Sequence, residues 1–229
     1  QGLPCEGKKE MMIEKRSVPA AAGFTLVELL VVISIIAILA GLSMSGVMWG
    51  RQSGEEGAVK SNITGLVSLL EQYAVETGDY PPSSLSFFRI PSNGINEGIE
   101  SVLACLETRK YNGPFIGDLD ERQRGNVDAD TISKLQADHL KKRLDWKRTD
   151  NQLWEYCDLW GNPLIYIHSR DYGELVNIQT IDGETITVSA KRDPETDGFY
   201  RPTEFQLWSL GVDGINSEYD EGDDICHWK

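Results

Sequence analysis

Six acidic side chains fall within a short stretch near the end of the chain, Asp213, Glu218, Asp220, Glu221, Asp223 and Asp224. Carboxylates this close repel one another, whereas calcium in proteins binds six to eight oxygen ligands. Zinc or copper would need softer ligands, and the stretch offers only Cys226. It is not an EF-hand loop, because Glu218 stands where that loop needs glycine and Ile215 where it needs an oxygen donor. A calcium loop and a solvated acidic tail both remain open.

A second carboxylate of interest, Glu28, precedes an apolar run. No charged side chain occurs from Leu29 to Met48, which matches the roughly 20 residues that a helix needs to cross a bilayer core of about 30 Å. A carboxylate near the start of such a helix costs about 2.5–3.5 kcal/mol on insertion scales, which favours a functional role. A cleaved secretory signal would have its small-residue cleavage site after the run. Gly23 lies before the run, which argues against such a signal.

Composition limits the possible functions. The chain has 229 residues, enough for one anchored domain of ordinary size. Its net charge of −14 should repel nucleic acid. It contains no GxSxG, HExxH, P-loop or GxGxxG motif. Its three histidines, His139, His168 and His227, have no evident nucleophile partner. We therefore expect a structural or binding protein and no enzyme.

The cysteines have no CxxC spacing, which argues against a zinc site. Cys5 precedes Gly23, which leaves Cys105, Cys157 and Cys226 in the rest of the chain. In an oxidising compartment one pair can form a disulfide. Three reduced, buried cysteines are an equal alternative, and the spacing does not decide between them.

Apolar residues at helical spacing continue beyond the apolar run, at Val59, Ile63, Leu66, Val67, Leu70, Tyr73 and Ala74. They predict an amphipathic helix that ends at Thr77–Gly78, just before Pro81 and Pro82. Shorter helices are expected over 99–106 and 132–148. Asp130 or Thr131 would cap the second, and its predicted inward side chains are Ile132, Leu135, His139, Leu140 and Leu144.

Later in the chain the pattern favours strands. We expect strands at 164–168 and 205–210, and a hairpin over 175–190 that turns at Asp182–Gly183. The fold class is therefore α+β, with a long N-terminal transmembrane and amphipathic helix packed against a small antiparallel sheet.

The stretch GFTLVELL, Gly23 to Leu30, resembles the class III signal of type IV pilins and of type II secretion pseudopilins. The resemblance implies that prepilin peptidase cleaves after Gly23 and that the new N-terminal Phe24 is methylated. It also implies that Glu28 pairs with the ammonium of a neighbouring subunit during assembly, since neither charge is tolerated alone in lipid.

The implied organisation has three parts. Residues 1–23 are a leader, 24–50 form the transmembrane half of the helix, and 51–229 form a periplasmic pilin-like domain that includes the outer half of the helix. Lys15 and Arg16 before the apolar run place the leader in the cytoplasm and the chain after about residue 50 outside.

Three later segments resemble the G-type major pseudopilin of type II secretion: DLWGNPLIY at 158–166, SLGVDG at 209–214 and DDICHW at 223–228. In that family a calcium ion ties down the last loop. The resemblance implies carboxylate ligands from Asp213, Asp223 and Asp224 and carbonyl ligands from Leu210 and, as a weaker match, Glu221. Residues 118–155 and 171–196 have no counterpart and are interpreted as insertions.

The function implied is that of a structural subunit of a periplasmic filament that drives protein export. Its partners would be further copies of itself, other pseudopilins, the inner-membrane platform of the secretion machine, prepilin peptidase and the inner membrane itself. The alternative is a minor pilin or a surface-presented binding module of a related type IV pilus.

Overall fold

The computed structural model describes residues 23–91, 93–117, 119–146, 148–217 and 222–228, with the backbone alone over 42–49. The chain divides into two compact units, Gln1–Trp49 and Gly50–Lys229. In the described residues we find no helix that is both long and apolar enough to cross a membrane. The expected span over 29–48 includes residues 42–48, whose side chains lie outside the described part.

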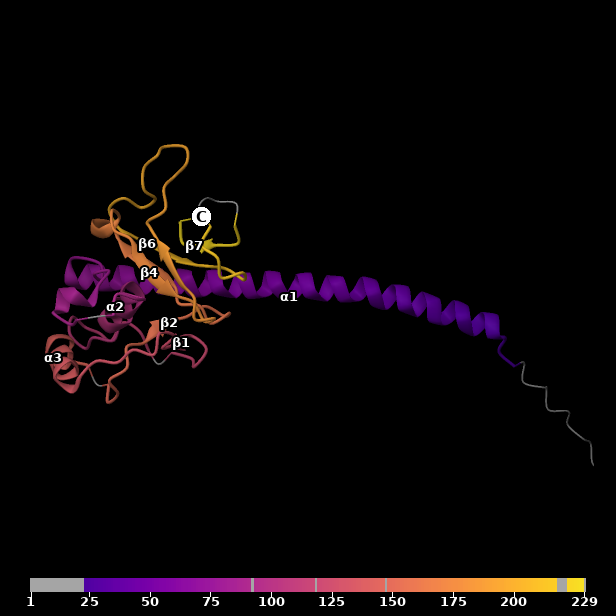
Figure 1. Cartoon of the computed structure of the whole chain (residues 1–229), viewed down its shortest axis with the longest axis horizontal. Helices are drawn as coiled ribbons and strands as arrows, with labels where there is room; N and C mark the ends of the chain where they lie inside the picture. Colours follow the sequence, from indigo (N-terminus) through magenta and orange to yellow (C-terminus); the bar gives the residue numbers. More distant parts are fainter. Residues whose placement is uncertain (1–22, 92, 118, 147, 218–221, 229) are drawn as a thin grey trace, which may run out of the picture. The chain divides into compact units, whose positions relative to one another are not determined.

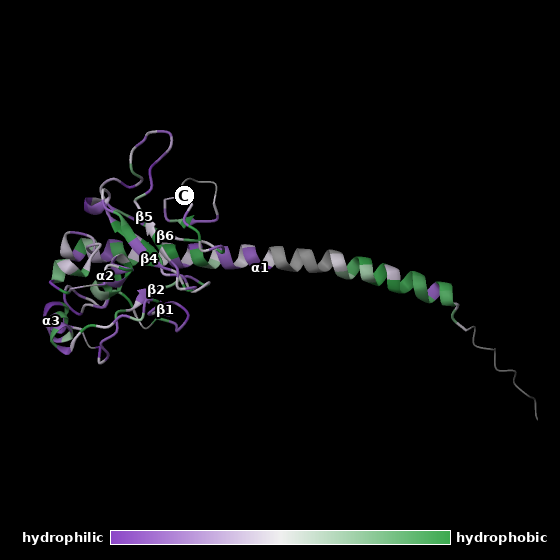
Figure 2. Ribbon diagram, viewed as in Figure 1, coloured by the Kyte–Doolittle hydropathy of each residue, from purple (hydrophilic) through white to green (hydrophobic). Residues whose placement is uncertain are grey.

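The first unit contains the start of α1 (Leu26–Thr77). Large apolar side chains are exposed along its first turns, from Leu26 at 79% to Leu39 at 57%. Figure 2 shows these turns mostly in the colour of hydrophobic residues. This segment has no hydrophilic face to turn toward water, apart from single polar positions such as Glu28 and Ser34.

In the second unit, α1 buries the face that its periodicity predicts. Val59, Ile63, Leu66, Leu70 and Tyr73 are all at most 8% exposed and belong to the main core cluster. The helix ends at Thr77, as predicted, and Gly78 follows with φ +88°. That left-handed conformation favours glycine, which therefore stops the helix here.

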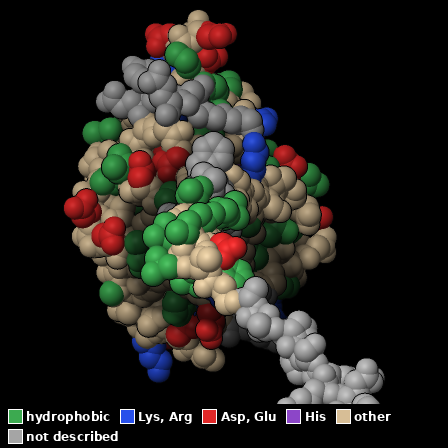
Figure 3. All heavy atoms as spheres, turned by 90° about the vertical axis from the view of Figure 1, so that its right-hand side faces the viewer, with side chains coloured by type: hydrophobic (Ala, Val, Ile, Leu, Met, Phe, Trp, Pro, Cys, Tyr) green, Lys and Arg blue, Asp and Glu red, His purple; other side chains and the backbone are tan. Residues whose placement is uncertain are grey.

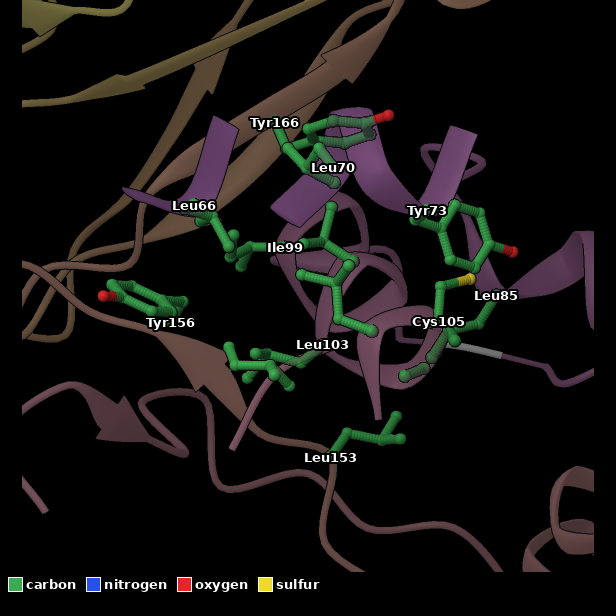
Figure 4. Packing of buried hydrophobic residues seen from close by; sticks show 14 of the residues in the cluster. Leu66, Leu70, Tyr73, Leu85, Ile99, Leu103, Cys105, Leu153, Tyr156 and Tyr166 are labelled. Carbon is green, nitrogen blue, oxygen red and sulfur yellow. The ribbon is translucent and has the colours of Figure 1, made fainter. Parts of the chain in front are cut away.

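The core forms where α1 meets α2 (Glu97–Leu106) and β3 (Ile165–His168). Figure 4 shows Leu66 and Leu70 of α1, Ile99 and Leu103 of α2 and Tyr166 of β3 pointing toward one another. The 3₁₀ helix η1 (Leu85–Phe88) adds buried residues to the same cluster. The predicted helix at 99–106 is confirmed, with a start two residues earlier.

Short antiparallel sheets complete the domain, as Figure 1 shows. β3 pairs with β6 (Phe205–Ser209), and β6 pairs with β7 (Ile225–Cys226). A 3₁₀ turn, η2 (Ser169–Asp171), leads from β3 toward the predicted hairpin, which is β4 (Val176–Gln179) with β5 (Thr185–Val188). β1 (Arg124–Gly125) pairs with β2 (Glu155–Tyr156). The α+β class is confirmed, although the two-residue strands were not predicted.

The helix expected over 132–148 is shorter and starts later, as α3 (Lys134–Leu144). Ser133 caps it, not Asp130 or Thr131, through a reciprocal capping box with Gln136. The expected inward positions Leu135 and His139 are both exposed, Leu135 at 81%.

The inward side of α3 is formed by Ala137, Leu140 and Leu144. These residues are three and four positions apart and therefore share one face. Leu135 lies five positions from Leu140, about 140° around a helix with 3.6 residues per turn. It therefore points away from the core.

Candidate functional site

Glu28 lies in the first turn of α1 and forms a local hydrogen-bonded pair with Thr25. Its Oε2 accepts from the Thr25 backbone N–H at 2.9 Å and from the Thr25 hydroxyl at 2.8 Å. The Glu28 N–H in turn donates to Thr25 Oγ1 at 3.2 Å. This is a capping box, since each residue satisfies a backbone donor of the other. Phe24 and Gly23, which flank the expected cleavage point, precede it and are exposed.

The C-terminal loop begins directly after β6. Leu210 is buried, and Gly211 follows with φ +73°. A Cβ on Gly211 would lie 2.5 Å from the Asp223 carboxyl carbon, so only glycine allows Asp223 to approach. Asp223 Oδ2 accepts from the Val212 N–H at 2.6 Å and from the Asp213 N–H at 3.2 Å. Asp223 therefore fixes the turn that carries Asp213.

Asp224 is 8% exposed and holds the other side of this loop. Its Oδ2 accepts from Lys191 Nζ at 3.0 Å and from the Ser217 N–H at 3.2 Å. Burial raises the pKa of Asp224, while the Lys191 ammonium opposes that rise. Asp213 is exposed, and its Oδ1 accepts from the Ile215 N–H at 2.8 Å.

Two oxygens of this loop suit a cation. Asp223 Oδ1 and Asp224 Oδ1 are buried without a hydrogen-bond partner in the described part of the chain, and such oxygens are commonly satisfied by an ordered water or an ion. Asp213, Asp223 and Asp224 are not among the described groups whose ligand atoms all lie within 4.8 Å of one another. Calcium would have to draw them closer. Glu221, the weaker predicted ligand, lies outside the described residues.

Another group of carboxylates does have its ligand atoms within 4.8 Å of one another: Glu100, Asp128 and Glu155. Burial, together with the charges of Asp130, Asp128 and Glu155, raises the pKa of Glu100 to about 10. Burial also raises the pKa of Asp130 and that of Glu155 to about 7. This cluster was not predicted from the sequence. One feature of the sequence could have indicated it: the acidic Glu100 lies between the apolar residues Ile99 and Val102, in a helix that is buried from Gly98 to Leu106.

Cys105, Cys157 and Cys226 are buried as thiols. Burial raises the pKa of Cys105 and that of Cys157 to about 12, which keeps both thiols protonated and unreactive. Of the two alternatives that the spacing left open, the structure has reduced, buried cysteines.

Comparisons with known proteins agree with the N-terminal motif. Residues 19–44 match the model of the prokaryotic N-terminal methylation motif. The chain is 25% identical to the type II secretion system core protein G of Escherichia coli K12 over 69% of this chain and 79% of that protein. It is 23% identical to the core protein G of Pseudomonas aeruginosa over 90% of this chain and 94% of the relative.

A pilus protein is also similar. The chain is 37% identical to the type IV wide pilus major component PilA4 of Thermus thermophilus, over 40% of this chain and 70% of that protein. No solved structure matches the chain. With the methylation motif, the α+β fold and these relatives, the chain belongs to the type IV pilin-like proteins, the family that includes the core protein G pseudopilins of type II secretion.

Proposed function

We propose that this chain is a structural subunit of a type II secretion filament and has no catalytic role. The observation that carries the proposal is the methylation motif at 19–44, which includes the start of α1, where the apolar side chains are exposed. Such side chains, from Phe24 to Leu39, need lipid or other copies of the chain to cover them. Both environments exist for a filament subunit, before and after assembly.

We further propose that prepilin peptidase removes residues 1–23 and that Phe24 becomes the methylated N-terminus. The apolar helix then holds the protein in the inner membrane, with the globular domain in the periplasm. The match to the methylation motif supports this order of events. In the filament, subunits would associate through these helices, together with other pseudopilins and the inner-membrane platform.

The C-terminal loop is proposed to bind calcium through Asp213, Asp223 and Asp224, with carbonyl ligands from Leu210 and Glu221. The unpartnered oxygens of Asp223 and Asp224 support this assignment. A cation with a preference for oxygen would neutralise these carboxylates and fix the loop between β6 and β7.

The similarity to a pilus major component favours one alternative, a pilus subunit that presents the inserted segments 118–155 and 171–196 as a binding surface. Deletion of the gene from its own bacterium separates the two functions. Loss of secreted proteins with normal surface pili supports a secretion subunit, and loss of pili with normal secretion supports the alternative.

Processing is tested by mass spectrometry of the full chain after coexpression with prepilin peptidase. The expected product starts at Phe24 and carries one N-terminal methyl group. Gly23→Leu, which places a bulky side chain at the cleavage point, should keep its leader under the same conditions. An unprocessed wild-type chain, or a cut after residue 48, contradicts the proposal.

A further inference from the structure

Three acidic side chains from separate segments meet inside the globular unit. Glu100 lies in the first turn of α2, Asp128 in the loop after β1, and Glu155 at the start of β2. One ligand oxygen from each lies within 4.8 Å of the others. Glu100 is 2% and Glu155 0% exposed, whereas Asp128 is partly exposed, so two of the three carboxylates lie away from solvent.

Glu100 is the most informative member of this cluster. Both of its carboxylate oxygens are buried without a hydrogen-bond partner in the described chain, and one of them lies within 4.8 Å of an oxygen of Asp128 and of Glu155. A buried carboxylate that is neither paired nor hydrogen-bonded is strongly disfavoured. Ion pairs among the described residues involve other acids, such as Glu107 and Asp224, and none of them involves Glu100.

The other two carboxylates are held in place by neighbouring groups. Asn96 Nδ2 donates to Glu155 Oε1 at 3.1 Å, and the Val127 N–H donates to both Glu155 oxygens at 3.2 and 3.0 Å. Asn93 Nδ2 donates to Asp128 Oδ2 at 2.6 Å. Metal-binding carboxylates are commonly oriented by such outer hydrogen bonds.

The loop that carries Asp128 has a further feature of cation-binding loops. Asn126, Asp128 and Asp130 alternate along the chain, as do the first three ligand positions of an EF-hand loop. Thr131 follows where that loop has glycine, so this loop is of another kind. Asp130 Oδ1 is also buried without a hydrogen-bond partner in the described chain.

We propose that Glu100, Asp128 and Glu155 bind one calcium ion, at a site made of different residues from those of the C-terminal loop. The ligands are carboxylate oxygens, which suit a hard divalent cation. Calcium takes six to eight oxygen ligands in flexible geometry, whereas magnesium demands a near-ideal octahedron and usually keeps several waters, so a cluster of protein carboxylates favours calcium. The three ligand atoms lie within 4.8 Å of one another, close enough for one ion to contact all three.

The ion would fasten the inserted segment to the core. Asp128 and Glu155 both belong to the segment 118–155, which contains β1 and α3, while Glu100 belongs to α2, which packs on β3. This site therefore serves the fold of the globular unit and does not depend on filament assembly. Its occupancy can be measured on isolated protein.

The test uses the full chain in detergent micelles, stripped with chelator and titrated with calcium by calorimetry. The double substitution Asp213→Ala and Asp223→Asn first removes one proposed ligand of the C-terminal loop and the charge of a second. We expect this protein to bind one equivalent of calcium, and the addition of Glu100→Gln to abolish that binding. Asp128→Asn, in a partly exposed loop, serves as a second variant should Glu100→Gln fail to fold.

Glu97→Gln is the matched control, because it removes a charge from the same turn of α2 but not from the ligand set. It should keep the calcium equivalent. Hydrogen exchange provides a local readout, since calcium should slow exchange of the Val127 amide at least tenfold. A folded double variant that binds no calcium overturns the proposal, as does unchanged binding in both Glu100→Gln and Asp128→Asn.

Discussion

Thr25 and Glu28 hydrogen-bond each other in both directions at the start of α1. The carboxylate of Glu28 is thus used within its own chain, in a capping box that satisfies two backbone donors. This gives Glu28 a local role beside the pairing with a neighbouring subunit that we propose. The two roles need different chemistry, because an amide side chain can accept the same hydrogen bonds but carries no charge.

Glu28→Gln therefore separates the roles. If the charge pairs with the ammonium of the next subunit, Glu28→Gln and Glu28→Ala should both insert normally and both fail to assemble. An unpaired ammonium in lipid costs about 3 kcal/mol or more, roughly a hundredfold in association. Filament yield by electron microscopy, against equal amounts of membrane-inserted subunit, measures the effect. Wild-type yield from Glu28→Gln with loss in Glu28→Ala would assign Glu28 to capping alone.

Gly98 lies where α2 contacts β3, and this contact leaves no room for a side chain. A Cβ on Gly98 would lie 2.2 Å from the Tyr166 carbonyl oxygen, so Gly98→Ala must push α2 off the strand. We expect a loss of about 3 kcal/mol in unfolding free energy by chemical denaturation. Gly65→Ala in α1 is the matched control, because nothing lies within 4 Å of its Cβ. It should stabilise by roughly 0.5–1 kcal/mol through helix propensity. Equal effects of both substitutions would contradict the packing.

Periodicity explains what could be predicted from the sequence. The apolar positions from Val59 to Tyr73 repeat at helical spacing, and Gly78 ends the helix by its left-handed backbone. The hairpin of β4 and β5 was likewise marked by a turn at Asp182–Gly183. These signals lie within one segment, so they need no knowledge of the tertiary structure.

The missed features depend on partners far along the chain. β1 and β2 are two residues each, and β1 pairs with a strand about thirty residues later. The carboxylates of Glu100, Asp128 and Glu155 converge only when these strands and α2 are packed. For α3, Ser133 competed successfully with Asp130 as the cap because Gln136 completes its capping box.

His227 provides a pH-dependent contribution to stability. Its Nδ1 accepts from the Leu207 N–H at 3.1 Å, and its ring stacks on Phe205. Burial, with the Arg201 charge adding to it, lowers the pKa of His227 to about 4. The folded state therefore binds fewer protons than the unfolded state between that value and the usual pKa of about 6.5. The contribution is complete above pH 6.5 and is lost as pH falls toward 4.

Comparison with His227→Gln isolates this effect, because glutamine does not titrate. From pH 7 to pH 4.5, the wild-type chain should lose on the order of 2 kcal/mol more unfolding free energy than the variant. Denaturation with guanidinium at each pH provides the measurement. His139→Gln, at an exposed position of α3, should instead follow the wild-type curve. Parallel curves for wild type and His227→Gln would show that His227 is not held neutral.

Calcium should stabilise the C-terminal loop independently of the buried site. In the Glu100→Gln background, where the buried site is removed, calcium should still raise the melting temperature of the full chain. At a hundredfold excess over the dissociation constant, binding adds about 2.7 kcal/mol. Asp213→Ala should abolish that gain with little change in the calcium-free protein, because Asp213 is exposed. Magnesium should substitute poorly, since it demands a tighter octahedron.

Lys191→Met tests the role of Asp224 in the same loop. Lys191 Nζ lies 3.0 Å from Asp224 Oδ2, and both side chains are at most 10% exposed. Removal of the ammonium leaves a buried carboxylate unpaired, which destabilises the calcium-free protein by about 3–5 kcal/mol. Calcium should restore part of this loss, so its stabilising effect should be larger in Lys191→Met than in the parent protein. An equal or smaller effect would mean that Asp224 serves the ion pair with Lys191 and not the metal. Figure 3 shows many acidic side chains on one face of the protein. If neither calcium nor chelator changes the melting temperature, the acidic loop is likewise only solvated surface.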